Sequence, residues 1–221
     1  LGLGVFLLAI YACARRNEKH KDCRETADLC VSRRKKRLQG IVFSCFIAFL
    51  LLFLLFPQKK SFEIDFLDVG QGDGIYLCTG GGTSMFIDGG STDVKQVGKY
   101  RILPFLKAKG VSEISYWFVS HTDTDHVSGL KEVLVSGYRV KYLVFAKAVE
   151  KEAKTKELAE LARSHGTKVL YMQAGDTVRS KRAAMRCLYP KAAEKGENIN
   201  DRCLVLQFEE GDISALFGGD I

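Results

Sequence analysis

The sequence lacks the cysteine patterns of small domains held together by disulfides or zinc. Its seven cysteines are scattered along the chain, and no two of them are spaced as Cys-x-x-Cys. This spacing excludes a disulfide framework and the common zinc-finger patterns. We therefore expect most of the cysteines to be buried thiols that act as small apolar side chains. Internal repeats and low-complexity tracts are also absent.

The larger part of the chain has almost no net charge. Of the formal charge of +7, residues 15–38 carry most, with ten Lys and Arg against four Asp and Glu. Residues 57–221 hold 23 Lys and Arg against 22 Asp and Glu. Net charge by itself therefore gives the globular part no nucleic-acid footprint.

Charge is also missing from two apolar segments near the start of the chain. We expect residues 1–14 to be the end of a transmembrane helix and residues 40–57 to be a second one, about 24 Å long over its uncharged part. The basic stretch 15–39 between them could bind nucleic acid or simply be solvated, but its position favours a cytoplasmic loop. Residues 60–221 would then be extracytoplasmic. Because the chain starts at Leu1 and stops at Ile221, we interpret it as a fragment.

From residue 62 onward, short strands alternate with turns and a few helices. Alternating or β-rich apolar runs predict the strands, and apolar residues at helical spacing predict the helices. The predicted strands are 62–69, 75–79, 85–87, 114–119, 142–146, 168–172, 186–189, 203–208 and 214–217, and the predicted helices are 95–109, 149–165 and one that follows Ser128. By pattern alone, this order indicates a domain of mixed α and β structure.

Metal-competent side chains are concentrated in a single hexapeptide between a predicted strand and a predicted helix. The four side chains are those of His121, Asp123, Asp125 and His126. A strand that ends in a loop opening a helix is where open α/β sheets place their chemistry. Imidazole and carboxylate donors together suit zinc, manganese or iron. An EF-hand is excluded because Ser128 and Leu134 stand where its loop needs glycine and glutamate. The alternative is a solvated acidic loop with two incidental histidines.

A second motif, Gly70-Gln71-Gly72-Asp73-Gly74, follows the first predicted strand. It is not a dinucleotide-binding loop, because its spacing is Gly-x-Gly-x-Gly and a strand follows it instead of a helix.

At the hexapeptide the chain resembles the metallo-β-lactamase superfamily, whose signature is His-x-His-x-Asp-His, with Asp123 in place of the second histidine. Together with the motif Phe66-Leu67-Asp68-Val69-Gly70-Gln71-Gly72-Asp73, this version is similar to the C-terminal domain of ComEC-type competence proteins, the membrane channels that bring DNA into bacteria. The resemblance covers residues 62–221. It implies an α+β fold, an αββα sandwich truncated at its C-terminus and preceded by transmembrane helices.

The resemblance also implies roles for the candidate site residues. His121 and Asp123 would hold one metal ion, Asp125 and His126 a second, and Asp220 would bridge both. Asp125 and Asp220 are the predicted catalytic residues.

Further polar residues are expected around this site. Asp88 would orient the metal ligands, although it could also cap a hairpin turn. Asp68 and Asp73 lie in the glycine-rich turn, where hydrogen bonding and substrate contact are both open.

One ligand of the family pattern is missing. The only histidine between the hexapeptide and Asp220 is His165, which lies in a charged helix and is more typical of a solvated side chain. Asn198, Asn200 or Asp201 could substitute. The oxygen-rich donor set shifts the expected divalent ion from zinc towards manganese, with magnesium also compatible.

Two such ions can share and activate a water, which suits phosphodiester hydrolysis but equally suits lactones, thioesters or β-lactams. The membrane context and the motif pair favour DNA. We predict a multi-pass cell-membrane protein whose domain is a nuclease that degrades one strand of incoming DNA. Its partners would be single- or double-stranded DNA, the lipid bilayer and other DNA-uptake proteins, with DNA contacts at Arg179, Lys181, Arg182 and Arg186. The alternatives are a DNA-binding or gating domain without turnover, and a membrane-anchored hydrolase of small molecules.

Overall fold

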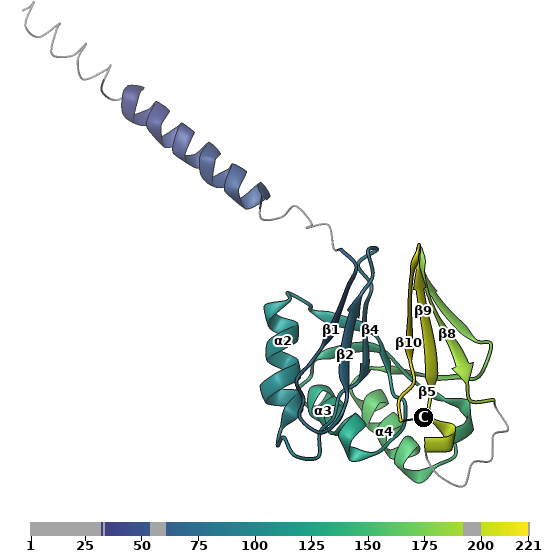
Figure 1. Ribbon diagram of the computed structural model, residues 1–221. Coiled ribbons are helices and arrows are strands. Elements are labelled where there is room, and N and C mark those ends of the chain that lie inside the picture. The colour runs from purple at the N-terminus through teal and green to yellow at the C-terminus, as the bar shows by residue number, and fades with distance from the viewer. Residues whose placement is uncertain (1–31, 33, 54–60, 192–199, 221) are drawn as a thin grey trace, which may run out of the picture. The chain divides into compact units, whose positions relative to one another are not determined.

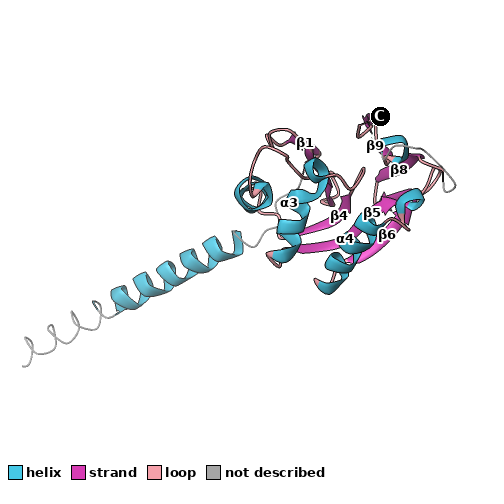
Figure 2. Cartoon of the chain, turned by 90° about the horizontal axis from the view of Figure 1, so that it is seen from below, coloured by secondary structure: helices cyan, strands magenta, loops and turns pink. Residues whose placement is uncertain are grey.

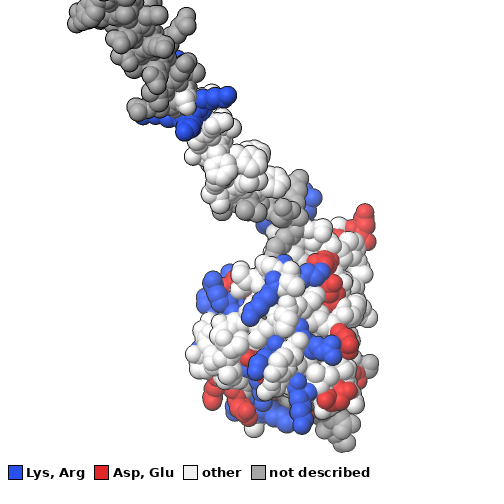
Figure 3. All heavy atoms as spheres, turned by 90° about the vertical axis from the view of Figure 1, so that its left-hand side faces the viewer, with Lys and Arg blue, Asp and Glu red and all other residues white. Residues whose placement is uncertain are grey.

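The computed structural model describes residues 32, 34–53, 61–191 and 200–220, and the chain divides into two units, 1–58 and 59–221. In the first unit the helix Arg34–Phe53 is 20 residues long, with a mean hydropathy of 1.7, and could cross a membrane by its length and composition. Four basic residues open it, and apolar side chains follow (Figure 3). The helix thus begins earlier than the apolar run that predicted it. The predicted segment 1–14 lies outside the described residues.

The second unit contains two β-sheets (Figure 1). A six-stranded sheet has its strands in chain order: β1 (Glu63–Phe66), β2 (Gly74–Cys78), β3 (Ser84–Asp88), β4 (Glu113–Phe118), β5 (Arg139–Ala146) and β6 (Lys168–Met172). The pairs β1·β2 and β2·β3 are antiparallel, whereas β3 to β6 run parallel. A four-stranded antiparallel sheet has the order β10 (Ile213–Phe217), β9 (Val205–Glu210), β8 (Ala183–Tyr189), β7 (Thr177–Ser180).

The α-helices lie on one face of the six-stranded sheet, and the four-stranded sheet lies on its other side (Figure 2). They are α2 (Leu103–Ala108), α3 (Thr124–Val135) and α4 (Ala153–Ser164), with a π-helical turn at Gly98–Ile102 and 3-10 turns at Lys147–Val149 and Asn200–Arg202. Within the described residues no helix covers the outer face of the four-stranded sheet. The α+β class and the sandwich are confirmed, with three layers of the αββα order described.

The core explains why the central strands are apolar throughout. Every residue of β3 is buried, because helices cover one face of the sheet and the second sheet covers the other. Phe86 of β3 stacks on Trp117 of β4, with ring centroids 4.3 Å apart. In β8 the burial alternates instead, with Met185 and Cys187 inside and Arg186 outside, because only its inner face is covered.

Three local predictions were wrong, each for a physical reason. Helix α3 begins at Thr124, so Asp125 and His126 lie in its first turn and not in a loop. Its first turn carries polar side chains, which hide the start of the apolar pattern. Asp88 does not cap a hairpin, because β3 and β4 are parallel and α2 connects them. Strand β7 was missed because its four residues, Thr-Val-Arg-Ser, are short and largely polar.

Candidate metal centre

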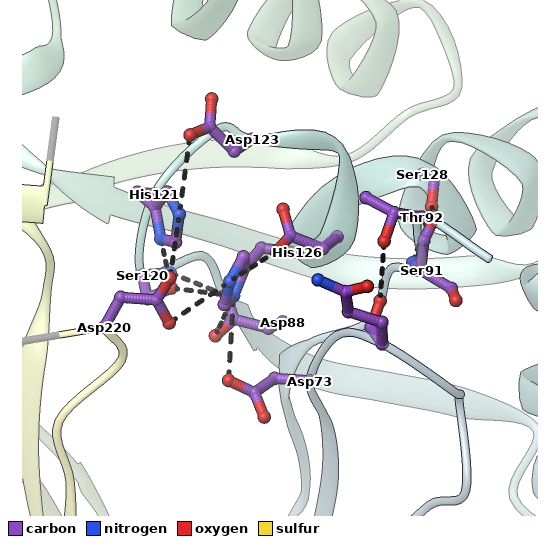
Figure 4. Close-up of polar contacts among 12 residues, drawn as sticks. Asp73, Asp88, Ser91, Thr92, Ser120, His121, Asp123, His126, Ser128 and Asp220 are labelled. Atoms are coloured by element: carbon purple, nitrogen blue, oxygen red, sulfur yellow. Dashed lines mark hydrogen bonds and ion pairs between the residues drawn. The ribbon is translucent and has the colours of Figure 1, made fainter.

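The donor side chains of both motifs lie close together, with Asp88 and Asp220 beside them (Figure 4). Asp88 ends β3, His121 follows β4 by three residues, and Asp220 follows β10 by three. Two overlapping groups have one donor atom from each residue within 4.8 Å of the others: His121, Asp125 and His126, and Asp73, His126 and Asp220. Carboxyl ends of neighbouring parallel strands are where such sites form in α/β sheets.

Asp88 is the buried anchor of this centre. Its side chain is 2% exposed; Oδ1 accepts a hydrogen bond from the Ser120 N–H (2.8 Å), and Oδ2 lies 3.1 Å from His126 Nδ1. The Trp117 indole donates to the Asp88 carbonyl at 2.6 Å. These contacts hold Asp88 at a φ of 58°, a backbone conformation that is uncommon outside glycine. Asp88 thus contacts the His126 ring, and its role in orienting the metal ligands stays a prediction.

Both histidine rings direct Nε2 at the carboxylates. His126 Nε2 lies 3.4 Å from Asp220 Oδ1 and 3.8 Å from Asp125 Oδ2. His121 Nε2 lies 3.7 Å from Asp220 Oδ2, and the two ring centroids are 3.9 Å apart. On the other side, Ser120 Oγ lies 3.1 Å from His121 Nδ1 and 3.3 Å from His126 Nδ1. The Nδ1 atoms thus face the protein, which leaves Nε2 as the donor for an ion.

The pKa shifts of this cluster indicate an excess of negative charge around the two histidines. Burial lowers the pKa of His126, but Asp88, Asp220 and Asp125 outweigh burial and raise that pKa to about 9. Burial and the neighbouring His126 lower the pKa of His121. Burial, followed by the negative charge of Asp88, raises the pKa of Asp73. Carboxylates that repel one another around two imidazoles fit a divalent cation, which would replace the proton on His126.

Asp123 is shared between this centre and helix α4. It occupies the N-cap position of α3, yet its side chain makes no capping hydrogen bond. Oδ1 accepts from Lys154 Nζ at 2.9 Å, while Oδ2 lies 3.8 Å from His121 Nε2. The hydrogen bond from Lys154 lowers the pKa of the Asp123 carboxyl, and the same bond raises the pKa of Lys154. His121 therefore groups with Asp125 and His126, while Asp123 lies close to His121 with one oxygen only, so their predicted pairing on one metal ion stays a prediction.

Glycines of the second motif bring Asp73 to the centre. A Cβ on Gly72, whose φ is 151°, would lie 2.4 Å from the Gly90 carbonyl oxygen and 2.5 Å from that of Asp125. A Cβ on Gly90 would lie 2.5 Å from the Thr124 carbonyl oxygen. The Asp73 N–H donates to the Asp125 carbonyl at 3.3 Å across this contact. Only glycine lets these backbones approach so closely, and Asp73 thereby becomes a candidate ligand instead of a turn residue.

The third histidine is not supplied by His165. That residue is exposed at the end of α4, where its Nδ1 lies 2.9 Å from the Leu161 carbonyl oxygen. Asp201 is exposed in a 3-10 turn, and its carbonyl accepts from the Tyr189 hydroxyl at 2.5 Å. Asn198 and the side chain of Asn200 lie outside what the structure describes, so their proposed substitution stays a prediction.

Two further sets of predicted residues do not belong to the donor groups of the centre. The Asp68 side chain is 85% exposed and pairs with Arg101 at 3.8 Å. The basic hairpin, defined as Arg179, Lys181, Arg182 and Arg186, lies on β7, β8 and their turn. Ala183 pairs with Glu210, beside the β9–β10 turn, so Lys181 and Arg182 of the β7–β8 turn lie at the opposite end of the sheet from Asp220. Arg186 instead pairs with Gln207, which pairs with Leu216, so it lies nearer the end of the sheet that leads to Asp220. DNA contact by the basic hairpin stays a prediction.

Sequence reasoning missed Cys203 as a neighbour of the centre. Its thiol is buried, and burial together with the nearby negative charge of Asp220 raises its pKa to about 11. The next residue, Leu204, donates its N–H to the Ser120 carbonyl at 2.9 Å. The signal was its place just before an apolar strand that leads to Asp220, but a lone cysteine carries little information.

Comparison with known proteins gives two sequence relatives, and no family model matches. The chain is 28% identical over 209 residues to ComE operon protein 3 of Bacillus subtilis (strain 168), a match that covers 87% of this chain and 27% of that protein. It is 32% identical over 97 residues to Recombination protein 2 of Haemophilus influenzae, covering 43% of this chain and 12% of that protein. The chain thus spans about a quarter or less of the length of these relatives.

Among solved structures, a metallo-β-lactamase from Staphylococcus aureus aligns with a TM-score of 0.50 at 12% identity, over 74% of this chain and 44% of that one. The fold is therefore that of the metallo-β-lactamases. Together with the sequence relatives, it confirms the resemblance to a ComEC-type fragment that the two motifs indicated.

Proposed function

We propose that the domain is a metal-dependent hydrolase that cleaves phosphodiester bonds of DNA, within a membrane protein of DNA uptake. The observation that carries this proposal is the convergence of two histidines and the carboxylates of Asp73, Asp125 and Asp220 around one point. In the proposal one strand of incoming DNA is degraded while the membrane part conducts the other.

The donor set fits one or two divalent ions. Two donor groups are available, His121, Asp125 and His126, and Asp73, His126 and Asp220. They overlap at His126, whose Nε2 can bind only one ion, so a second ion would be held by the remaining donors. When bound, such ions neutralise charge on a phosphoryl group and lower the pKa of a water. Manganese or zinc suits this mixture of nitrogen and oxygen donors, and magnesium is compatible with its oxygen-rich half.

The chain's own residues prepare the centre. Asp88 accepts a hydrogen bond from the His126 Nδ1–H, which would leave the Nε2 lone pair available to an ion beside the carboxylates. The Ser120 hydroxyl lies within hydrogen-bonding distance of the Nδ1 atoms of both histidines. Lys154 holds one oxygen of Asp123 and keeps that carboxyl ionised, because its hydrogen bond favours the charged form.

DNA is supported as the substrate by the sequence relatives and by the apolar helix. The segment 15–39 holds most of the basic charge, which favours the cytoplasmic side. If the helix Arg34–Phe53 crosses the cell membrane, the domain that follows it would lie outside the cytoplasm. Basic and acidic side chains are interspersed on the face of the domain that Figure 3 shows. Affinity for DNA would therefore come from contacts near the centre more than from the overall field.

A DNA-binding or gating domain without turnover is the second candidate. It is favoured by two observations on the described residues: no third histidine joins the centre, and Asp123 turns half of its carboxylate to Lys154. Such a domain would bind DNA and metal but leave the strand intact.

Cleavage by the purified 221-residue chain separates these candidates. Labelled single- and double-stranded DNA would be incubated with manganese, zinc or magnesium, and bound metal would be measured on the same sample. We expect cleavage by the wild type and at least a hundredfold loss, with less metal, in Asp125→Asn. The matched control Asp212→Asn changes an exposed residue of the β9–β10 turn and should behave as the wild type.

A folded, metal-loaded chain that leaves both kinds of DNA intact with all three ions would overturn the nuclease. Retained DNA binding in that sample would favour the gating domain.

A further inference from the structure

A polar cavity lies beside the metal centre, between α3 and α4. Its volume is about 240 Å³. Its polar lining consists of Thr122, Thr124, Ser128, Lys131, Lys154 and Glu157. Lys154 joins the cavity to the centre, because it also binds Asp123. We call this space the α3–α4 cavity.

The lining has the chemistry of an anion site. Lys131 comes from α3 and Lys154 from the first turn of α4, and hydroxyl groups from the segment 122–128 lie between them. Thr124 and Lys154 lie in the first turns of α3 and α4, each of twelve residues, and there the helix dipole favours negative charge. Ammonium groups and hydroxyl donors arranged in this way suit the oxygens of a phosphate.

One buried hydroxyl of this lining has no protein partner. Thr122 is 6% exposed, and its Oγ1 makes no hydrogen bond within the described part of the chain. Buried polar groups are nearly always satisfied, so this unpaired hydroxyl, carried by a residue that lines the cavity, is a donor that remains available to a ligand. Thr122 is also the residue directly after His121, which ties the cavity to the centre.

The charges now in the cavity can be exchanged for a ligand. Lys131 lies 3.5 Å from Glu157, but their side chains are 43% and 75% exposed, and exposed pairs of this kind are weak. A phosphate makes stronger, charge-assisted hydrogen bonds to the same ammonium group. Glu157 itself opposes an anion, so its removal should favour binding.

We propose that the α3–α4 cavity binds a backbone phosphate of a DNA strand that lies across the metal centre. Lys131 and Lys154 would contact this phosphate, and Thr122 and Thr124 would line the binding site around it. The inference rests on the proposed function for the identity of the strand. It adds to that function a phosphate-binding site that is distinct from the metal ligands.

Binding of a fluorescent oligothymidylate to the purified full chain, measured by anisotropy with strand integrity checked by electrophoresis, tests this inference. Lys131→Gln should weaken binding roughly three- to tenfold and reduce the slope of log affinity against log salt by about 1. Glu157→Gln should strengthen binding. Lys156→Gln, an equal charge change at an exposed position of α4 outside the cavity, should stay within about twofold of the wild type.

A neutral methylphosphonate linkage, moved one position at a time along the strand, locates the phosphate. At one position the neutral linkage should weaken binding to the wild type but not to Lys131→Gln. If Lys131→Gln behaves as Lys156→Gln, or if no position shows this coupling, the inference is overturned even when the chain cuts DNA. If the coupling is found and no strand is ever cut, the phosphate site stands and the nuclease falls.

Discussion

Asp88 is the residue whose replacement tests the electrostatics of the centre most directly. It is 2% exposed, as is His126, and its Oδ2 lies 3.1 Å from His126 Nδ1. Asp88→Asn keeps the shape of the side chain and an oxygen that can accept from Ser120, and asparagine tolerates the φ of 58° better than most residues. The variant removes the negative charge that faces His126.

The expected magnitude follows from the pKa of His126, which the folded state raises to about 9 from 6.5. A raised pKa of about 2.5 units corresponds to about 3 kcal/mol of stability in the metal-free protein. Because the shift is upward, this stability is complete below pH 6.5 and is lost as the pH rises through 9. Asp220 and Asp125 contribute to the same shift, so Asp88→Asn should remove only part of this stability. We expect a loss on the order of 1–3 kcal/mol at pH 6, which becomes smaller above pH 9, where only a hydrogen bond to a neutral imidazole is lost.

The assay is chemical or thermal unfolding in the presence of EDTA at several pH values. For a domain of this size, the loss at pH 6 corresponds to a fall in Tm of roughly 2–12 °C. NMR titration of the histidine side chains should show the pKa of His126 moving down in Asp88→Asn. His165→Gln, which changes an exposed histidine at the end of α4, is the matched control and should leave the pH dependence unchanged.

Parallel pH profiles of wild type and Asp88→Asn would refute this reasoning. A constant difference in the free energy of unfolding would mean that Asp88 acts through packing or through Ser120, and that His126 is not charged in the metal-free fold.

Two further predictions address the backbone contact and the membrane topology. Gly90→Ala should destabilise the domain by roughly 1–3 kcal/mol and reduce bound metal, because its Cβ would lie 2.5 Å from the backbone of Thr124 and Asp125. A Cβ on Gly218 would meet nothing within 4 Å, so Gly218→Ala should be neutral in unfolding experiments. Equal stability of the two variants would contradict the packing argument. In intact cells, a cysteine introduced as Lys151→Cys should react with an impermeant label while one introduced within 15–39 should not, and labelling of position 151 only after permeabilisation would reverse the topology.

Local patterns were sufficient for the order of most strands and helices and for the ligand types. A strand such as β3 reads as apolar because its own residues are buried, and the hexapeptide at 121–126 contains its donors in six consecutive positions. Polar segments were the weak point. The start of α3 and the strand β7 have few apolar residues, so no periodicity marked them.

The sequence by itself determined a domain of mixed α and β structure and a His- and Asp-rich hexapeptide, because these depend on residue types at short spacing. The α+β class followed from the resemblance to the metallo-β-lactamase superfamily that the two motifs carry. Only the tertiary structure decided which distant side chains join that centre. Asp73 enters because two glycines allow three backbone segments to meet, and Asp123 binds Lys154 because α4 packs beside α3. Strand register places Lys181 and Arg182 of the basic hairpin at the end of their sheet away from Asp220. Each of these outcomes depends on contacts between residues far apart in the chain, which packing and strand pairing determine and which local pattern does not encode.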